Sequence, residues 1–199
     1  ILFSDSRYKN ADTMLRDADT AMYHAKDSGK GRYEVFDASM HQTVQNALSL
    51  EADIREAIEW QEFIPYFQPI IKLANKELVG FEALARWQSS KRGFVFPDDF
   101  IPLTEETNLV QEIDLQIVKK ACQQLKIWQD KLSRYDLYVS CNLFCSHFFN
   151  STLPDDIEKI LVDTGLKPEN LRVELTERAL LENTDIVLTN MKALKRLGV

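Results

Sequence analysis

Three polar side chains, Glu82, Asn142 and Glu174, occur in short segments whose alternating pattern predicts β-strands. Each of them alternates with apolar neighbours and comes near the end of its strand. If the three strands lie side by side in a barrel of parallel strands, the three side chains meet at one end of it, where sites in such barrels are built. Carboxylate and amide oxygens favour a hard cation, Mg²⁺ or Mn²⁺, over zinc. A metal site is therefore one interpretation of these three residues.

The same residues also allow a purely structural interpretation. A glutamate in a strand often faces solvent, and an inward asparagine often makes only a structural hydrogen bond. In residues 79–87 the two-residue period puts apolar side chains on one face and Glu82, Leu84 and Arg86 on the other. An ordinary half-buried strand would show the same pattern with its charges turned to water. Periodicity alone leaves both interpretations open.

The identity of the residues around Glu82 adds a family resemblance. Glu82-Ala83-Leu84 is followed by Arg86-Trp87, preceded by Tyr66-Phe67-Gln68-Pro69-Ile70 and followed further on by residues 100–107, Phe-Ile-Pro-Leu-Thr-Glu-Glu-Thr. These motifs, in this order, resemble the signature of EAL domains, the bacterial phosphodiesterases that open the second messenger cyclic di-GMP. The resemblance implies hydrolysis of cyclic di-GMP to the linear dinucleotide pGpG.

The resemblance also implies roles for single residues. Asn142 matches the Ser-x-Asn-Leu segment of the family, and Glu174 with Glu177 matches its Glu-x-x-Glu segment. Glu82, Asn142 and Glu174 are then the metal ligands, of two Mg²⁺ or Mn²⁺ ions in the intact site. Glu177 resembles an acid that supports a loop near the site. The general base of the family lies outside this chain.

Substrate contacts are implied at three further positions, Gln68, Leu84 and Arg86. Arg86 suits a phosphate, because a planar guanidinium can donate two hydrogen bonds to it. In the family, the remaining parts of the site follow a segment similar to residues 194–199. We therefore expect this chain to be an incomplete and inactive portion of the enzyme.

A second resemblance lies at the start of the chain. Residues 15–26 together with residues 29–33 resemble the final helix and strand of GGDEF domains, the diguanylate cyclases. The Gly-Gly-Asp-Glu-Phe turn of that family is missing from the sequence, so we assign no catalysis to this part. The predicted organisation is a GGDEF remnant over residues 1–37, a linker and leading helix over 38–62, and the N-terminal part of an EAL domain over 63–199.

Periodicity predicts strands over residues 63–73, 77–88, 135–144 and 171–176, separated in most places by amphipathic helices. A short strand is predicted over residues 32–36, a helix from Leu48, and a turn between Lys91 and Phe96. Strands that alternate with helices predict a parallel α/β fold. With the family resemblance, the expected fold is a partial TIM-like (β/α) barrel of the EAL type, preceded by the helix and strand of the GGDEF remnant.

Composition limits the partners. The 199 residues carry a formal net charge of -7, which argues against a nucleic-acid polymer or an anionic membrane surface as partner. No apolar run is long enough to span a bilayer, and three scattered cysteines fit a reducing cytoplasm better than a disulfide framework or a zinc site. The predicted location is therefore cytoplasmic.

Two functions remain after this reading of the sequence. The first is a cyclic di-GMP phosphodiesterase in the intact protein, and the alternative is a non-catalytic receptor that binds cyclic di-GMP for signalling. Half a barrel would also leave strand edges unpaired, which predicts self-association, for example as a homodimer.

Overall fold

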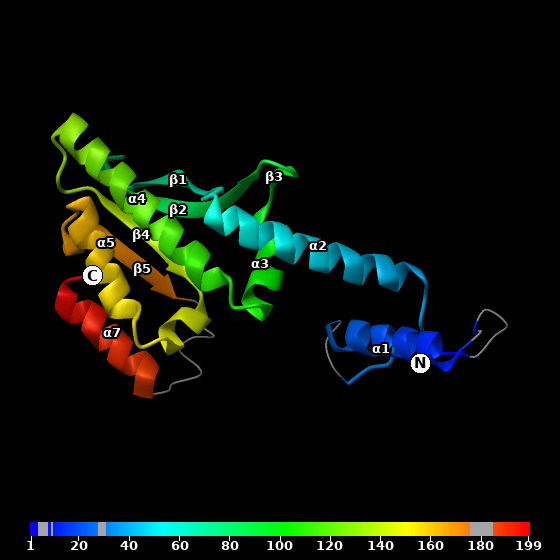
Figure 1. The fold of residues 1–199 in the computed structure, drawn as a ribbon. Helices are drawn as coiled ribbons and strands as arrows, with labels where there is room; N and C mark the ends of the chain where they lie inside the picture. Colours follow the sequence, from blue (N-terminus) through cyan, green and yellow to red (C-terminus); the bar gives the residue numbers. More distant parts are fainter. Residues whose placement is uncertain (4–7, 9, 28–30, 176–184) are drawn as a thin grey trace. The chain divides into compact units, whose positions relative to one another are not determined.

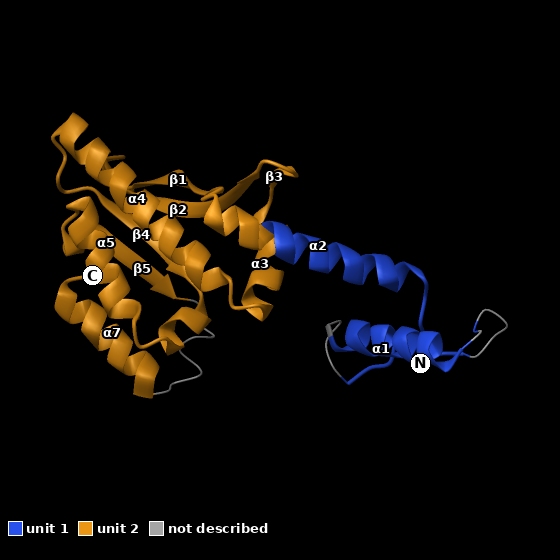
Figure 2. Ribbon diagram, in the orientation of Figure 1, with its two compact units in different colours: residues 1–53 blue, residues 54–199 orange. Residues whose placement is uncertain are grey.

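The computed structural model describes residues 1–3, 8, 10–27, 31–175 and 185–199. The chain divides into two compact units, residues 1–53 and 54–199, which are coloured separately in Figure 2 and are described one by one. No helix in the described parts of the chain has the length and apolar character needed to cross a bilayer.

The first unit contains helix α1 (Ala11–Asp27) and the N-terminal part of helix α2 (Ser39–Glu59). Asn10 accepts a hydrogen bond from the backbone N–H of Thr13 (2.8 Å), which caps the start of α1. Asp37 accepts one from the N–H of Ser39 in the same way (2.8 Å), so α2 begins at Ser39. The expectation that this helix starts near Leu48 was therefore too late in the sequence.

A buried carboxylate joins the elements of the first unit. Asp17 of α1 accepts hydrogen bonds from Tyr8 (3.1 Å) and shares one with the imidazole of His41 (2.7 Å). Burial raises the pKa of Asp17, but these two hydrogen bonds and the charges of His41 and Arg16 outweigh burial and hold it below its usual value. The predicted strand over residues 32–36 is not a strand in the described residues, although the N–H of Phe36 bonds the carbonyl of Ile1 (2.9 Å).

The second unit is built on a five-stranded mixed sheet, β1 (Phe63–Ile71), β2 (Leu78–Ser89), β3 (Gly93–Val95), β4 (Tyr138–Leu143) and β5 (Leu171–Leu175). The order is β1-β2-β4-β5, and β3 pairs with β2. The β2–β4 and β4–β5 pairs are parallel, as predicted, whereas β1 is antiparallel to β2. Only a short turn joins β1 to β2, and a parallel pair needs a crossover of a dozen residues or more.

Helices occupy the connections between the parallel strands. Between β2 and β4 the chain forms α3 (Pro97–Glu106) and α4 (Val110–Leu132); between β4 and β5 it forms the 3₁₀ turn η1 (Cys145–Phe149), α5 (Leu153–Thr164) and the turn η2 (Pro168–Asn170). Helix α7 (Asp185–Leu197) is the last described element. The α5 helix ends at Gly165, which has the left-handed conformation that glycine adopts easily.

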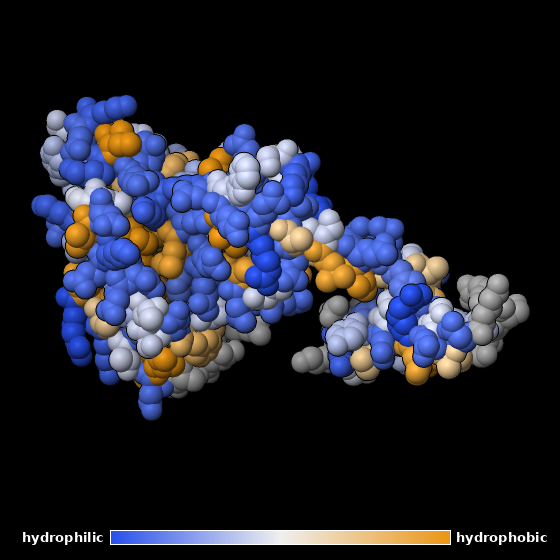
Figure 3. Space-filling view, viewed as in Figure 1, coloured by the Kyte–Doolittle hydropathy of each residue, from blue (hydrophilic) through white to orange (hydrophobic). Residues whose placement is uncertain are grey.

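The long helix α4 packs across β1, β2 and β4, with α5 beside it (Figure 1). The indole of Trp128 in α4 contacts the rings of Phe67 in β1 (centroids 4.7 Å apart) and Phe81 in β2 (4.5 Å). Odd-numbered residues of β1 and β2 therefore face the helices, and the even-numbered residues face away from them. On the surface drawn in Figure 3, hydrophobic atoms form separate small groups among hydrophilic ones.

One glycine sets how closely two strands approach each other. Gly80 of β2 pairs with Tyr138 of β4, and a Cβ added at Gly80 would lie 2.6 Å from the Tyr138 carbonyl oxygen. The guanidinium of Arg172 lies over the Tyr138 ring, 3.4 Å from the ring centroid. Only glycine fits where this parallel pair starts, two residues before Glu82.

Candidate functional site

The three predicted metal ligands lie on three neighbouring strands and on the same face of the sheet, the one that α4 does not cover. Glu82 is on β2, Asn142 on β4 and Glu174 on β5. Asn142 and Glu174 are paired across the β4–β5 ladder, and the side-chain amide of Asn142 donates a hydrogen bond to Glu82 (2.9 Å). Glu82 lies 60 positions before Asn142 in the sequence and Glu174 lies 32 positions after it, and Asn142 links the two acids through a hydrogen bond to the first and strand pairing with the second.

Ser140 is a fourth polar residue of this face, and no role was predicted for it from the sequence. It pairs with Glu82 across the β2–β4 ladder, it is 1% exposed, and its hydroxyl donates a hydrogen bond to Glu174. Two positions before Asn142 in a strand, Ser140 must share its face, so the two-residue period contained the signal. Ser140 and Asn142 together connect the two carboxylates across β4.

The predicted substrate-contacting residues extend the same face. Gln68 of β1 pairs with Glu82, and Leu84 and Arg86 follow Glu82 along β2. Arg86 donates a hydrogen bond to the carbonyl oxygen of Ala85 (2.7 Å), and its guanidinium lies 5.7 Å from the ring centroid of Tyr66. The face therefore runs from acids at Glu82 to a cation at Arg86.

A buried acid holds the end of β4 from the helix side. Asp114 of α4 accepts a hydrogen bond from the backbone N–H of Phe144 (3.0 Å) and contacts Nδ1 of His147 at 3.3 Å. Both Asp114 and His147 are buried, and burial raises the pKa of Asp114 although these two contacts oppose the rise. Because Phe144 is two residues after Asn142, Asp114 fixes the backbone that carries the amide.

The donor set of the exposed face matches a hard cation in chemical type. Glu82 and Glu174 offer carboxylate oxygens, and the Asn142 amide, which uses its NH₂ group toward Glu82, keeps its oxygen for another partner. Among the described residues, no three His, Cys, Asp or Glu side chains lie close enough to hold a metal ion. Glu177 lies outside the described residues. Metal ligation at these positions stays a prediction.

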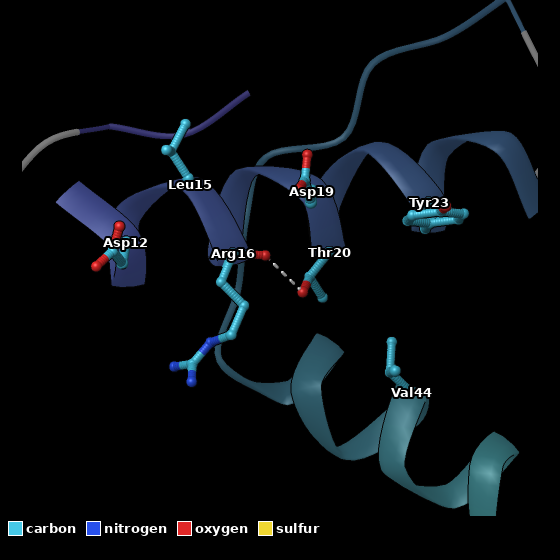
Figure 4. A pocket seen from close by; sticks show the side chains of 7 residues that line it. All are labelled: Asp12, Leu15, Arg16, Asp19, Thr20, Tyr23 and Val44. Atoms are coloured by element: carbon cyan, nitrogen blue, oxygen red, sulfur yellow. Dashed lines mark hydrogen bonds between the residues drawn. The ribbon is translucent and has the colours of Figure 1, made fainter.

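A surface depression of about 590 Å³ lies in the first unit, where α1 faces Val44 of α2 (Figure 4). Asp12, Arg16 and Asp19 of α1 line it, and the hydroxyl of Thr20 bonds the Arg16 carbonyl (2.9 Å). None of the predicted site residues belongs to this depression. We do not assign it a function.

Comparison with known proteins gives one family match, to the EAL domain, over residues 51–199. An uncharacterized signaling protein of Caulobacter vibrioides is 36% identical over 191 residues, which are 96% of this chain and 23% of that protein. The bifunctional diguanylate cyclase/cyclic di-GMP phosphodiesterase MucR of Pseudomonas aeruginosa is 33% identical over 94% of this chain and 27% of its own length. The cyclic di-GMP phosphodiesterase PdeR of Escherichia coli is 32% identical over 100% of this chain and 30% of its own length.

Solved structures that are similar to this chain are also EAL proteins. The MucR phosphodiesterase in complex with cyclic di-GMP superposes with a TM-score of 0.70 at 30% identity, over 76% of this chain and 61% of that one. The EAL enzyme Bd1971 in its cGMP-bound form superposes with a TM-score of 0.71 at 30% identity, over 79% of this chain and 44% of that one. The chain spans about a quarter of the length of the curated relatives it matches.

Proposed function

Because this chain belongs to the EAL domain family, we propose that the intact protein is a phosphodiesterase that hydrolyses cyclic di-GMP to pGpG. The observation that carries the proposal is the hydrogen bond from Asn142 to Glu82, with Glu174 paired beside Asn142. This arrangement brings two acids and an amide from three strands to one place. Relatives named as cyclic di-GMP phosphodiesterases support the substrate.

In this proposal Glu82, Asn142 and Glu174 hold divalent cations through oxygen. EAL phosphodiesterases depend on divalent metal as a class, and Mg²⁺ or Mn²⁺ suits this donor set. When bound, the cations would supply Lewis-acid activation of the phosphodiester and of the attacking water. Ser140 orients the Glu174 carboxylate by donating to it, and Asn142 orients Glu82.

Three residues of the same face bind and orient the substrate in this proposal. Arg86 offers its guanidinium to a phosphate, Gln68 lies across the strand pair from Glu82, and Leu84 lies between Glu82 and Arg86. The Arg86 cation is already braced by the Ala85 carbonyl and the Tyr66 ring, which reduces the side-chain freedom lost on binding. Glu177 supports a loop near the site.

The proposal also covers the organisation of the chain. Residues 1–37 are assigned to the end of a GGDEF domain, residues 38–62 to a linker and leading helix, and residues 63–199 to part of an EAL domain. The bifunctional name of MucR supports the tandem order. The proposed location is the cytoplasm, the proposed ligand is cyclic di-GMP, and the proposed assembly is a homodimer.

The test is hydrolysis of cyclic di-GMP by the intact protein with Mg²⁺ or Mn²⁺, with pGpG measured by chromatography. We expect Glu82→Gln to lower kcat at least about 100-fold, because it removes a charged metal ligand. Glu77→Gln is the matched control, since Glu77 is exposed, precedes the first residue of β2 and pairs with Arg134. Activity of Glu82→Gln equal to that of the control would refute the ligand assignment.

The receptor alternative is separated from the phosphodiesterase by the same preparation. A receptor would bind cyclic di-GMP without producing pGpG at any metal concentration. An intact protein that neither binds nor hydrolyses cyclic di-GMP would refute both functions.

A further inference from the structure

Glu62, which lies between helix α2 and strand β1, holds the end of strand β2 at three points. Its carboxylate accepts hydrogen bonds from Nε1 of Trp87 (3.0 Å) and from the backbone N–H of Ser90 (3.0 Å). Its backbone carbonyl accepts a third hydrogen bond, from the N–H of Gln88 (3.1 Å). A single residue just before the sheet thus binds three residues of the segment that directly follows Arg86.

Strand β4 does not support the part of β2 that carries Arg86. In the described part of the chain, the β2–β4 ladder ends at Ala83, three residues before Arg86. Beyond Ala83, β1 pairs with β2 as far as Trp87, and the short strand β3 pairs with residues 87–89. The position of Arg86 therefore depends on this corner of the sheet, where Glu62 binds, rather than on β4 and β5.

Glu62 is itself held in place by helix α4. The ammonium group of Lys120 donates hydrogen bonds to the carbonyl oxygens of Gln61 (2.6 Å) and Phe63 (2.7 Å), the residues before and after it. The N–H of Glu62 donates to the carbonyl oxygen of Ala57 in the last turn of α2 (2.9 Å). Because the backbone is fixed on both sides, the Glu62 carboxylate is a firm anchor for the end of β2.

The Glu62 carboxylate is charged at neutral pH. Burial raises its pKa, but the hydrogen bonds from Ser90 and Trp87 outweigh burial and lower this pKa below its usual value. Hydrogen bonds to an ionised acceptor are about twice as strong as those between neutral groups. Because Trp87 is completely buried, its indole N–H cannot turn to water if the carboxylate is removed.

The indole that Glu62 holds belongs to the residue next to Arg86. Trp87 and Arg86 point to opposite faces of β2, because neighbouring residues of a strand alternate. The indole packs in the core against the rings of Phe63 and Phe100, with centroids 5.5 and 6.0 Å away. Trp87 and Arg86 share a peptide group, so a shift of the backbone at Trp87 also moves the guanidinium on the other face.

We infer that Glu62 is a positioning residue for Arg86, because by holding Trp87 and Ser90 it sets where the guanidinium meets a phosphate of the substrate. This inference rests on the proposed function and deepens it by adding a residue that controls substrate affinity without touching the substrate. Arg86 lies about 13 Å beyond Glu82 along β2, at a rise of about 3.3 Å per residue. A change at Glu62 should therefore act on substrate binding and leave the candidate metal ligands in place.

The test is steady-state hydrolysis of cyclic di-GMP by the intact protein with Mg²⁺, well below the Tm of every variant. Glu62→Gln keeps the shape of the side chain but turns one of its two acceptor oxygens into an NH₂ group that faces an N–H donor. We expect KM to rise on the order of 10-fold, because a displaced guanidinium loses most of a charge-assisted hydrogen bond to phosphate. We expect kcat to stay within about 2-fold, which is the sign of lost uniform binding.

A second variant and a matched control accompany Glu62→Gln. Trp87→Phe removes the indole N–H and keeps an aromatic ring in the core, so KM should rise in the same direction, on the order of 3-fold. The control is Glu56→Gln, because Glu56 forms an exposed ion pair with Lys91 of the same turn. Water screens this pair, so kcat and KM of the control should equal those of the unchanged protein. Circular dichroism and Tm establish that each variant is folded.

A double-mutant cycle separates positioning from a merely structural role. Arg86→Ala removes the group that Glu62 is inferred to position, so adding Glu62→Gln to it should change KM by less than about 2-fold. If Glu62→Gln raises KM as much in the Arg86→Ala background as alone, Glu62 does not act through Arg86 and the inference is refuted. If Glu62→Gln does not fold, Trp87→Phe alone and combined with Arg86→Ala gives the same test.

The other outcomes separate the inference from the proposed function. If the unchanged protein hydrolyses cyclic di-GMP and Glu62→Gln has the kcat and KM of Glu56→Gln, the positioning role is refuted and the proposed function stands. A fall in kcat with unchanged KM would refute the positioning role as well. If the protein binds cyclic di-GMP without hydrolysing it, Kd replaces KM and the same rise is expected. If the unchanged protein does not bind cyclic di-GMP, the proposed function fails and the role of Glu62 fails with it.

Discussion

Replacing Asp114 by leucine should destabilise the second unit strongly, because Asp114 is a buried acceptor for two donors. The N–H of Phe144 lies 3.0 Å from its carboxylate, and Nδ1 of His147 lies 3.3 Å away. Each buried donor left without an acceptor costs about 1–3 kcal/mol, so Asp114→Leu should lower the free energy of unfolding by about 2–6 kcal/mol. Leucine adds apolar volume but satisfies neither donor.

Asparagine at the same position separates charge from hydrogen bonding. Asp114→Asn keeps one oxygen that can accept from Phe144, so we expect a smaller loss of about 1–2 kcal/mol. The control is Asp130→Asn on the same helix, where the exposed ion pair with Lys126 contributes little because water screens it. The expected order of stability is therefore the control, then Asp114→Asn, then Asp114→Leu.

Urea unfolding followed by circular dichroism measures the three free energies, and an unchanged m-value establishes that the same transition is compared. Hydrogen exchange adds a local readout. The amide of Phe144 should exchange faster in Asp114→Leu than in the unchanged protein, and this increase should exceed that at the amide of a strand residue such as Phe81. The reasoning is refuted if Asp114→Leu loses no more stability than Asp130→Asn. In that case the buried carboxylate would not anchor the end of β4.

Two further predictions concern titration. Burial raises the pKa of Glu62, but hydrogen bonds from Ser90 and Trp87 outweigh burial and hold this pKa below 4.5. The stability that the Glu62 carboxylate contributes is therefore present above about pH 4.5 and is lost as the pH falls through the folded-state pKa. The difference in unfolding free energy between the unchanged protein and Glu62→Gln should shrink from pH 7 to pH 3 in urea titrations. Burial raises the pKa of Cys122 to about 12 and that of buried Cys141 well above its usual value, so iodoacetamide at pH 8 should label neither thiol before unfolding, as read by mass spectrometry; early labelling of either would contradict their burial.

The family was predicted from the sequence and is confirmed by the EAL match over residues 51–199. Motif residues carried that prediction, because their identities are specific where their periodicity is not. Strands β2, β4 and β5 and the presence of amphipathic helices between them were predicted for a physical reason as well, since regular apolar periodicity leaves few other structures. The roles of Glu82, Asn142 and Glu174 remain predictions.

Other features could not be predicted from the sequence, because the residue pattern was too short or does not indicate in which direction a strand runs. Alternation shows that β1 is a strand but not that it runs antiparallel to β2. Three residues, Gly93–Val95, are too few for a period, so β3 was predicted as part of a turn. Asp114 did leave a signal, because an acid among Ile113, Ile117 and Val118 on the apolar side of a helix requires a buried partner.

The antiparallel start of the sheet has a consequence for the order of folding. The β1–β2 pair joins residues close in sequence, whereas the parallel β2–β4 pair must first close a loop of more than fifty residues. We expect the hairpin, with Gln68 already opposite Glu82, to form early and to serve as the template on which β4 and then β5 add. The candidate site would thus be assembled strand by strand, with Glu174 arriving last.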